Sequence, residues 1–177
     1  FNSMNSIRAL VNEDPTLAKE AITQLSNVLR NSLLMGRKKL ISLDDEMKLV
    51  NDYLGLEKTR FEERLTIKKD IDKESGKLLI PPLMIQTLVE NGIKHGTSKL
   101  PEGGTVEIIS SIKKGDLEVV IFNSGVYDET KKSETGFGLL NTKQRLKLMY
   151  GDKATFQIVN ENNRVKTTLL IPKETIL

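Results

Sequence analysis

The sequence predicts an α+β fold, in which helices cover one face of a mixed β-sheet. Three observations lead to this prediction. Apolar residues recur with the helical period through residues 1–62, they alternate with the period of strands in much of the rest, and strands and helices mix there without a βαβ rhythm. The 177-residue chain is long enough for one domain with a helical appendage.

Residues 1–62 predict three helices. Residues 12–15 end the first, because the proline disfavours helical geometry in the residue before it. Pro15 suits the first turn of the second helix, which ends near Gly36. Ser42, followed by Asp45, is a capping pattern for the third helix. The apolar stripe expected on this third helix comprises Leu43, Met47, Val50, Leu54 and Phe61.

The first two helices have an apolar side that must be covered. Two interpretations follow: a hairpin that pairs with a second copy of the chain, or a hairpin that packs on its own domain. We favour the first, a homodimer through residues 1–35. The expected seam consists of Ile7, Leu25, Leu29 and Leu33.

The rest of the chain predicts five strands and two helices. Strands are expected at residues 65–71, 105–113, 117–123, 155–160 and 164–171, and helices at residues 81–95 and 139–150. On the second strand Val106, Ile108 and Ile112 are expected on one side, and on the third Leu117, Val119 and Ile121 are expected to face one way. Asn162 and Asn163 predict a turn between the last two strands, and the polar residues 125–137 are long enough for a functional lid.

Composition excludes several kinds of site. The chain has no cysteine and one histidine, so it has no disulfide scaffold, no thiolate zinc site, no cysteine nucleophile and no multi-histidine metal site. A net charge of +3 with interspersed signs is too mild to indicate nucleic acid. No apolar run approaches the roughly 20 residues that span a bilayer, so we expect no membrane contact by this chain.

Two short motifs could carry chemistry. Gly136-Phe137-Gly138 stands directly before the helix that begins at Leu139, where backbone N–H groups and the positive helix end can bind phosphate. Glycines in that position are more often plain turn residues.

The second motif lies on the helix that ends at His95. Spacings of three and four residues put Glu90, Asn91 and Lys94 on one helical face. An amide, a carboxylate and an ammonium group there suit a hydrated Mg²⁺ with attached phosphates. The alternatives are an exposed ion pair and a histidine that caps or packs against the helix end.

Taken in order, longer segments are more specific. Three of them resemble the GHKL-type ATP-binding domain: the segment LVENGIKHG, a strand that ends in Asn123-Ser124-Gly125, and the segment GFGLLNTKQRL. Four further segments resemble the LytS-type sensor histidine kinases: FNSMNSIRAL, LSNVLRNSL, LDDEMKLVNDYLGLEKTRF and IPPLMIQTLVENGIKHG. The resemblance covers practically the whole chain.

This resemblance implies a fold and a function. The fold would be a helical hairpin followed by a Bergerat-type α/β sandwich, with residues 1–40 left from the dimerisation and phosphotransfer unit and residues 41–177 as the ATP-binding catalytic domain. The chain would be the cytoplasmic catalytic portion of a membrane-anchored bacterial sensor. It would bind ATP and Mg²⁺ and transfer the γ-phosphoryl group to a histidine, from which a response regulator would take it. In this family the acceptor histidine opens an H-F-L-F-N segment, which would place it three positions before Phe1.

The resemblance also implies roles for single residues. Asn91 would bind Mg²⁺, Lys94 would touch phosphate and His95 would line the nucleotide pocket. Glu90 would either orient the attacking group or pair with Lys94. The remaining nucleotide-contacting residues would be Asn123, Gly125, Gly136, Phe137, Gly138 and Leu139; Asn141 and Arg145 follow on the same helix.

Asn123 departs from the family pattern, which has an aspartate that accepts a hydrogen bond from the adenine amino group. An uncharged amide makes a weaker bond, and it can flip to satisfy either adenine or guanine. A non-catalytic nucleotide-sensing or dimerisation module is therefore the alternative function. A GHKL hydrolase is disfavoured, because Thr87 stands where those enzymes have a general-base glutamate one turn before the metal-binding asparagine.

Overall fold

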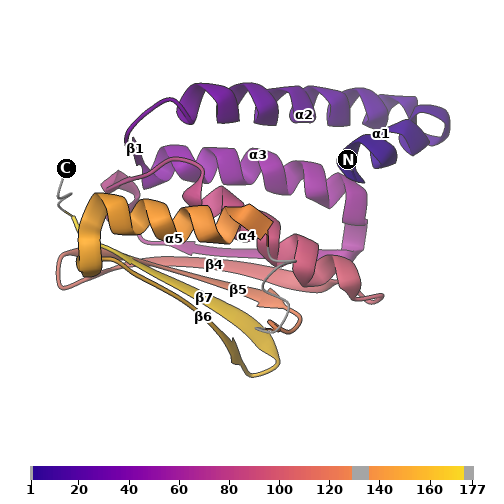
Figure 1. Cartoon of the computed structure of the whole chain (residues 1–177). Coiled ribbons are helices and arrows are strands. Elements are labelled where there is room, and N and C mark those ends of the chain that lie inside the picture. The colour runs from indigo at the N-terminus through magenta and orange to yellow at the C-terminus, as the bar shows by residue number, and fades with distance from the viewer. Residues whose placement is uncertain (1, 129–135, 174–177) are drawn as a thin grey trace.

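The computed structural model describes residues 2–128 and 136–173, and all its larger helices lie on one side of a single large sheet (Figure 1). The helices are α1 (Asn2–Glu13), α2 (Pro15–Met35), α3 (Leu43–Phe61), α4 (Met84–His95) and α5 (Gly136–Tyr150). The strands are β1 (Ile41–Ser42), β2 (Leu65–Ile71), β3 (Leu79–Ile80), β4 (Gly104–Lys113), β5 (Asp116–Ser124), β6 (Thr155–Glu161) and β7 (Arg164–Ile171). The predicted α+β class, with helices on one face, is confirmed.

The large sheet has the strand order β2-β4-β5-β7-β6, and β1 pairs separately with β3. The pair β2–β4 is parallel and the other neighbours are antiparallel, which makes the sheet mixed. Asn162 and Asn163 both have positive φ, as expected for the tight turn between β6 and β7. Ile112 lies on the same side of β4 as Val106 and Ile108, but it is 40% exposed near the end of the strand. Ser110 is the buried residue before it, and its hydroxyl lies 2.6 Å from that of Ser75.

The main core lies between the sheet and the layer formed by α3, α4 and α5, while α2 stacks on α3 from outside (Figure 1). The predicted stripe of α3 is buried in this core at every position. Ser42 caps α3, since its hydroxyl accepts a hydrogen bond from the Asp45 N–H at 3.1 Å. This layering positions α4, the helix with the Asn91 motif, directly against β5.

The start of α4 differs from the prediction. The helix begins at Met84 rather than at the prolines, because Leu83 adopts a left-handed conformation with φ of 63°. A side chain from α3 replaces the missing local cap. The fully buried Glu46 carboxylate accepts hydrogen bonds from the N–H groups of Leu83 at 2.7 Å and Gln86 at 3.1 Å. Burial raises the pKa of Glu46.

The N-terminal hairpin packs on its own domain, and the predicted seam divides into two groups. Ile7 is buried against Ala21 and Leu56, and Leu25 packs on the same cluster. Leu29 and Leu33 are 57% and 70% exposed. Ile7 is therefore not available to a seam between copies, because α2 and α3 of the same chain cover it, whereas Leu25 is only half-buried.

Candidate functional site

A narrow cavity lies between α4, the first turn of α5 and the inner face of β5, β7 and β6. Its volume is about 50 Å³, far below the roughly 300–1,000 Å³ of typical ligand pockets. A ligand of ordinary size therefore fits only if some of the lining residues move. The cavity is lined by Leu88, Asn91, Gly92, His95, Asn123, Val126, Tyr127, Leu139, Ile158, Val165 and Thr167.

Asn91 has an oriented side chain in this cavity. Its Nδ2 donates a hydrogen bond to the backbone carbonyl of Thr87 at 2.7 Å. Because only the NH₂ end of an amide can donate, this bond fixes the orientation and leaves Oδ1 as the outward acceptor. A Cβ at Gly138 would lie 3.5 Å from Asn91 Nδ2, so the first turn of α5 comes close to it. An amide oxygen so placed suits Mg²⁺.

Glycines allow α4 to approach the end of β5. A Cβ at Gly92 would lie 3.0 Å from Asn123 Oδ1, and one at Gly96 would lie 2.5 Å from Asn123 Nδ2. Gly125 has φ of +118°, and a Cβ there would lie 2.8 Å from the Gly96 Cα. Three glycines thus bring the helix backbone onto the Asn123-Ser124-Gly125 segment, where a side chain would separate them.

The Asn123 amide is oriented as well. Asn123 is 5% exposed, and its Nδ2 donates to the Ser124 carbonyl at 3.0 Å. A flip of the amide would lose this bond and turn Oδ1 toward a carbonyl oxygen. The expectation that Asn123 flips freely between adenine and guanine is therefore corrected: its oxygen is held as the acceptor.

Glu90 and Lys94 of α4 do not line this cavity. They line a separate groove of about 500 Å³ between α2, α3 and α4, together with Tyr53, Glu57 and Arg60 among others. Glu90 Oε1 accepts a hydrogen bond from Gln86 Nε2 at 2.8 Å. Glu90 and Lys94 line this groove, whereas Asn91 lines the cavity. Glu90 and Asn91 are consecutive and diverge by about 100° around the helix, so they do not share a face; Lys94, three residues after Asn91, is only about 60° from it.

The remaining predicted residues are placed as follows. His95 and Leu139 line the cavity with Asn91 and Asn123. Gly136 and Phe137 begin α5, but the side-chain surroundings of both, and most of the predicted lid (residues 129–135), lie outside the described residues. Arg145 does not line the cavity; its guanidinium donates to the Pro82 carbonyl at 2.7 Å and ties α5 to the start of α4.

No group of three or more histidine and acidic side chains that could hold a metal ion occurs within residues 2–128 and 136–173. A divalent ion bound beside Asn91 would need most of its ligands from water and from phosphate oxygens. That donor set is usual for Mg²⁺ bound together with a nucleotide.

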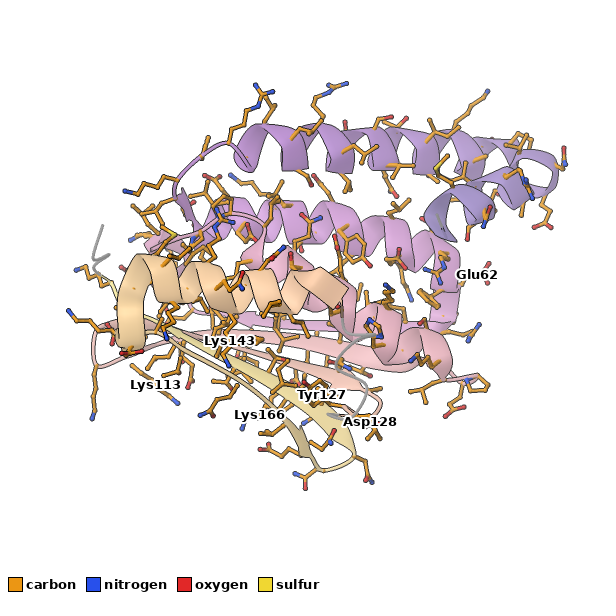
Figure 2. The ribbon with its side chains drawn as sticks, viewed as in Figure 1. Glu62, Lys113, Tyr127, Asp128, Lys143 and Lys166 are labelled. Atoms are coloured by element: carbon orange, nitrogen blue, oxygen red, sulfur yellow. The ribbon has the colours of Figure 1, made fainter. Side chains whose placement is uncertain are left out.

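Seven lining residues were not singled out individually in the sequence: Leu88, Gly92, Val126, Tyr127, Ile158, Val165 and Thr167. A signal existed for the last two, since strand alternation puts them on the same face as the buried Leu169. No comparable signal exists for Tyr127, which follows β5 and lies near Asp128 where that strand ends (Figure 2).

Known proteins resemble this chain in sequence and in fold. Residues 1–65 match the family model described as Histidine kinase. The chain is 36% identical over 190 residues to Sensor protein LytS of Staphylococcus haemolyticus (strain JCSC1435), a match that covers 99% of the chain and 32% of the relative. The chain belongs to the histidine kinase family. The resemblance to LytS-type sensor kinases is confirmed, and the chain spans about a third of the length of such relatives.

Solved structures of histidine kinases share the fold. The catalytic domain of histidine kinase ThkA aligns with a TM-score of 0.58 at 20% identity and covers 76% of this chain and 94% of that chain. Histidine kinase ThkA in complex with response regulator protein TrrA aligns with a TM-score of 0.53 at 17% identity, over 98% of this chain and 58% of that chain. The predicted GHKL-type sandwich is thereby confirmed. Among the described residues, no helix is both long and apolar enough to cross a bilayer.

Proposed function

We propose that this histidine kinase chain binds ATP with Mg²⁺ in the cavity beneath α4. The observation that carries the proposal is the convergence of Asn91, His95 and Asn123 on one cavity at the start of α5. Asn123 Oδ1 would accept a hydrogen bond from the adenine amino group. Asn91 Oδ1 would face the ion and the phosphates, and the first turn of α5, with Gly136 and Gly138, would donate backbone N–H groups to them.

The proposed reaction is transfer of the γ-phosphoryl group to a histidine side chain. Phosphoryl transfer depends mainly on positioning and on electrostatic stabilisation. Mg²⁺, when bound, would neutralise charge on the phosphate oxygens. Lys94, about 60° around α4 from Asn91, would reach the γ-phosphate by a rotation of its exposed, flexible side chain. Glu90, in the groove toward α2, would face the acceptor histidine or its helix rather than the nucleotide.

We further propose the partners. An aspartate of a response regulator would take the phosphoryl group from the histidine, as the association of ThkA with its response regulator suggests by analogy. A second copy of the chain would pair with the exposed apolar residues of α2. The whole protein would be a membrane-anchored sensor with this portion in the cytoplasm. His95, the one histidine of the sequence, is not proposed as the acceptor, because it lines the nucleotide cavity.

Calorimetry with ATP in the presence and absence of Mg²⁺ tests nucleotide binding. The wild-type chain should bind, with a clear gain from the metal, and Asn91→Ala should remove that gain. Asn51→Ala is the matched control, since Asn51 is exposed on α3, away from the cavity. Absence of binding at millimolar ATP by the wild type would overturn the proposal.

A non-catalytic nucleotide-sensing or dimerisation module is the second candidate, favoured by the neutral Asn123 in place of an aspartate. Labelled ATP separates the two functions. Incubation with a longer chain that contains the H-F-L-F-N histidine should give acid-labile phosphate on that histidine if the chain is catalytic. Binding without any transfer would support the sensing module.

A further inference from the structure

The three residues that follow Gly125 cross the end of the sheet from one strand to another that is not its neighbour. They leave the end of β5, which is the central strand of the sheet, and pass β7 to reach β6, the edge strand. There the Asn160 side chain holds them with two hydrogen bonds to a single residue. The Tyr127 N–H donates to Asn160 Oδ1 at 2.8 Å, and Asn160 Nδ2 donates to the Tyr127 carbonyl at 2.9 Å.

This pair of bonds copies the pairing of two peptide groups in an antiparallel sheet. Asn160 lies opposite Val165 in the β6–β7 ladder, and both Val165 and Ile158 line the cavity. The amide therefore fixes the Tyr127 main chain at the cavity rim. Both bonds involve main-chain atoms of Tyr127, so the side-chain torsions of the tyrosine remain able to change.

Val126 and Tyr127 form the side of the cavity that can move most easily. The other lining residues belong to α4, α5 or the sheet, whereas Val126 and Tyr127 lie outside every helix and strand. A base can enter a cavity of about 50 Å³ only by moving a wall. The rotation of the Tyr127 side chain on a fixed backbone would enlarge the cavity on this side.

We propose that Tyr127 contacts the base of the nucleotide with its aromatic ring and that Asn160 positions it. This inference rests on the proposed function, since it assigns the base end of the same site. The neighbours of Tyr127 in the cavity are mostly apolar, among them Val126, Leu139 and Ile158, which suits a flat aromatic ring and not a phosphate. Asn123 would read one edge of the base, and Tyr127 would cover a face of it.

Calorimetry on the whole chain tests the role of Tyr127 with three ligands, each with Mg²⁺: ATP, GTP and inorganic tripolyphosphate. Tyr127→Phe keeps the ring and should bind ATP within about twofold of the wild type. Tyr127→Leu keeps apolar bulk without a π-face and should bind ATP roughly tenfold more weakly. GTP binding should weaken similarly, and tripolyphosphate binding should be unchanged in both variants.

Asn160 acts through Tyr127, so its effect must depend on the ring. Asn160→Ala should weaken ATP binding about threefold in the wild-type background and not at all in Tyr127→Leu. Gln157→Ala is the matched control, because Gln157 is an exposed amide on β6 that does not line the cavity. A purely structural role for Asn160 would weaken tripolyphosphate binding as well.

The outcomes separate the two proposals. If the wild type binds no Mg²⁺-ATP, the proposed function fails and this inference fails with it. If the wild type binds and Tyr127→Leu binds equally well, only the inference is overturned. Equal losses for ATP and tripolyphosphate would also overturn it, since the tyrosine would then shape the cavity without touching the base. Far-UV circular dichroism and thermal unfolding verify that each variant is folded.

Discussion

Asn123 lies against the backbone of Gly92, so closely that a Cβ at Gly92 would sit 3.0 Å from Asn123 Oδ1. Asn123 Oδ1, which is proposed to accept a hydrogen bond from the base, can occupy this position because Gly92 on the facing helix has no side chain. Its amide nitrogen is held by the Ser124 carbonyl at 3.0 Å, so the group has little room to adjust. The geometry of the base-reading oxygen is fixed jointly by α4 and β5.

Gly92→Ala should therefore weaken ATP binding by about three- to tenfold. The added methyl group gains helix propensity of about 0.5–1 kcal/mol, but it must displace Asn123 by a few tenths of an ångström. The net change in unfolding free energy should be small while the affinity falls. Gly55→Ala on α3 is the control: a Cβ there meets nothing closer than Gln24 Nε2 at 3.9 Å. That variant should be slightly more stable, with unchanged affinity, and an equally small effect of both substitutions would contradict the prediction.

Asn123→Asp should raise the ratio of ATP to GTP affinity by about five- to tenfold. The carboxylate strengthens the acceptor for the adenine amino group and repels the carbonyl of guanine. It also loses the bond to the Ser124 carbonyl, so the unfolding free energy should fall by roughly 1–3 kcal/mol. Calorimetry with both nucleotides and urea unfolding measure the two effects. An unchanged ratio would mean that Asn123 does not contact the base.

Local patterns predicted the elements that depend on local residues, and missed those set by tertiary contacts. The Ser42 cap and the Asn162-Asn163 turn use nearby groups, and both are observed. The start of α4 could not be predicted in this way, because Glu46, some 40 residues upstream, supplies its cap. Periodicity marked Ile7 as apolar but could not say that Leu56 of the same chain would cover it.

The candidate site follows the same division. Asn91, His95 and Asn123 were identified in the sequence and meet in one cavity. The sequence analysis did not predict that Glu90 and Asn91 line different hollows. The spacing between residues on a helix does not show which other elements pack against each side of that helix. Tyr127 gave no periodic signal, since only the path of the chain after β5 brings it back to Asn160.

The apolar surface of α2 should mediate association of two copies. Leu29 and Leu33 are more than half exposed, so Leu29→Asp with Leu33→Asp should make the chain monomeric without lowering its unfolding free energy as a monomer. Leu148→Asp is the control, because Leu148 is 72% exposed on α5 and should leave association unchanged. Light scattering over a range of concentrations measures the assembly. A wild-type chain that stays monomeric at high concentration would contradict this surface assignment.

Glu46 should be more important for stability than any exposed acid. Glu46→Ala leaves the N–H groups of Leu83 and Gln86 buried without their acceptor, each at a cost of about 1–3 kcal/mol, so a total loss of roughly 2–6 kcal/mol is expected. Urea unfolding measures it. Glu102→Ala, at an exposed position after α4, should change the unfolding free energy by less than about 0.5 kcal/mol.

The pH dependence of this contribution tests its physical origin. Burial raises the pKa of Glu46 above the ordinary value of 4.5, although the backbone N–H groups of Gln86, Leu83 and Ile85 and the charge of Arg145 act in the opposite direction. The folded chain then holds a proton that the unfolded chain has already released. Stability from this group is present below about pH 4.5 and declines as the pH rises through the folded pKa. Glu46→Gln cannot titrate, so the unfolding free energy of the wild type relative to this variant should fall with rising pH. A relative stability that increases with pH would mean that hydrogen bonds and Arg145 outweigh burial, and that the carboxylate is the form that caps α4.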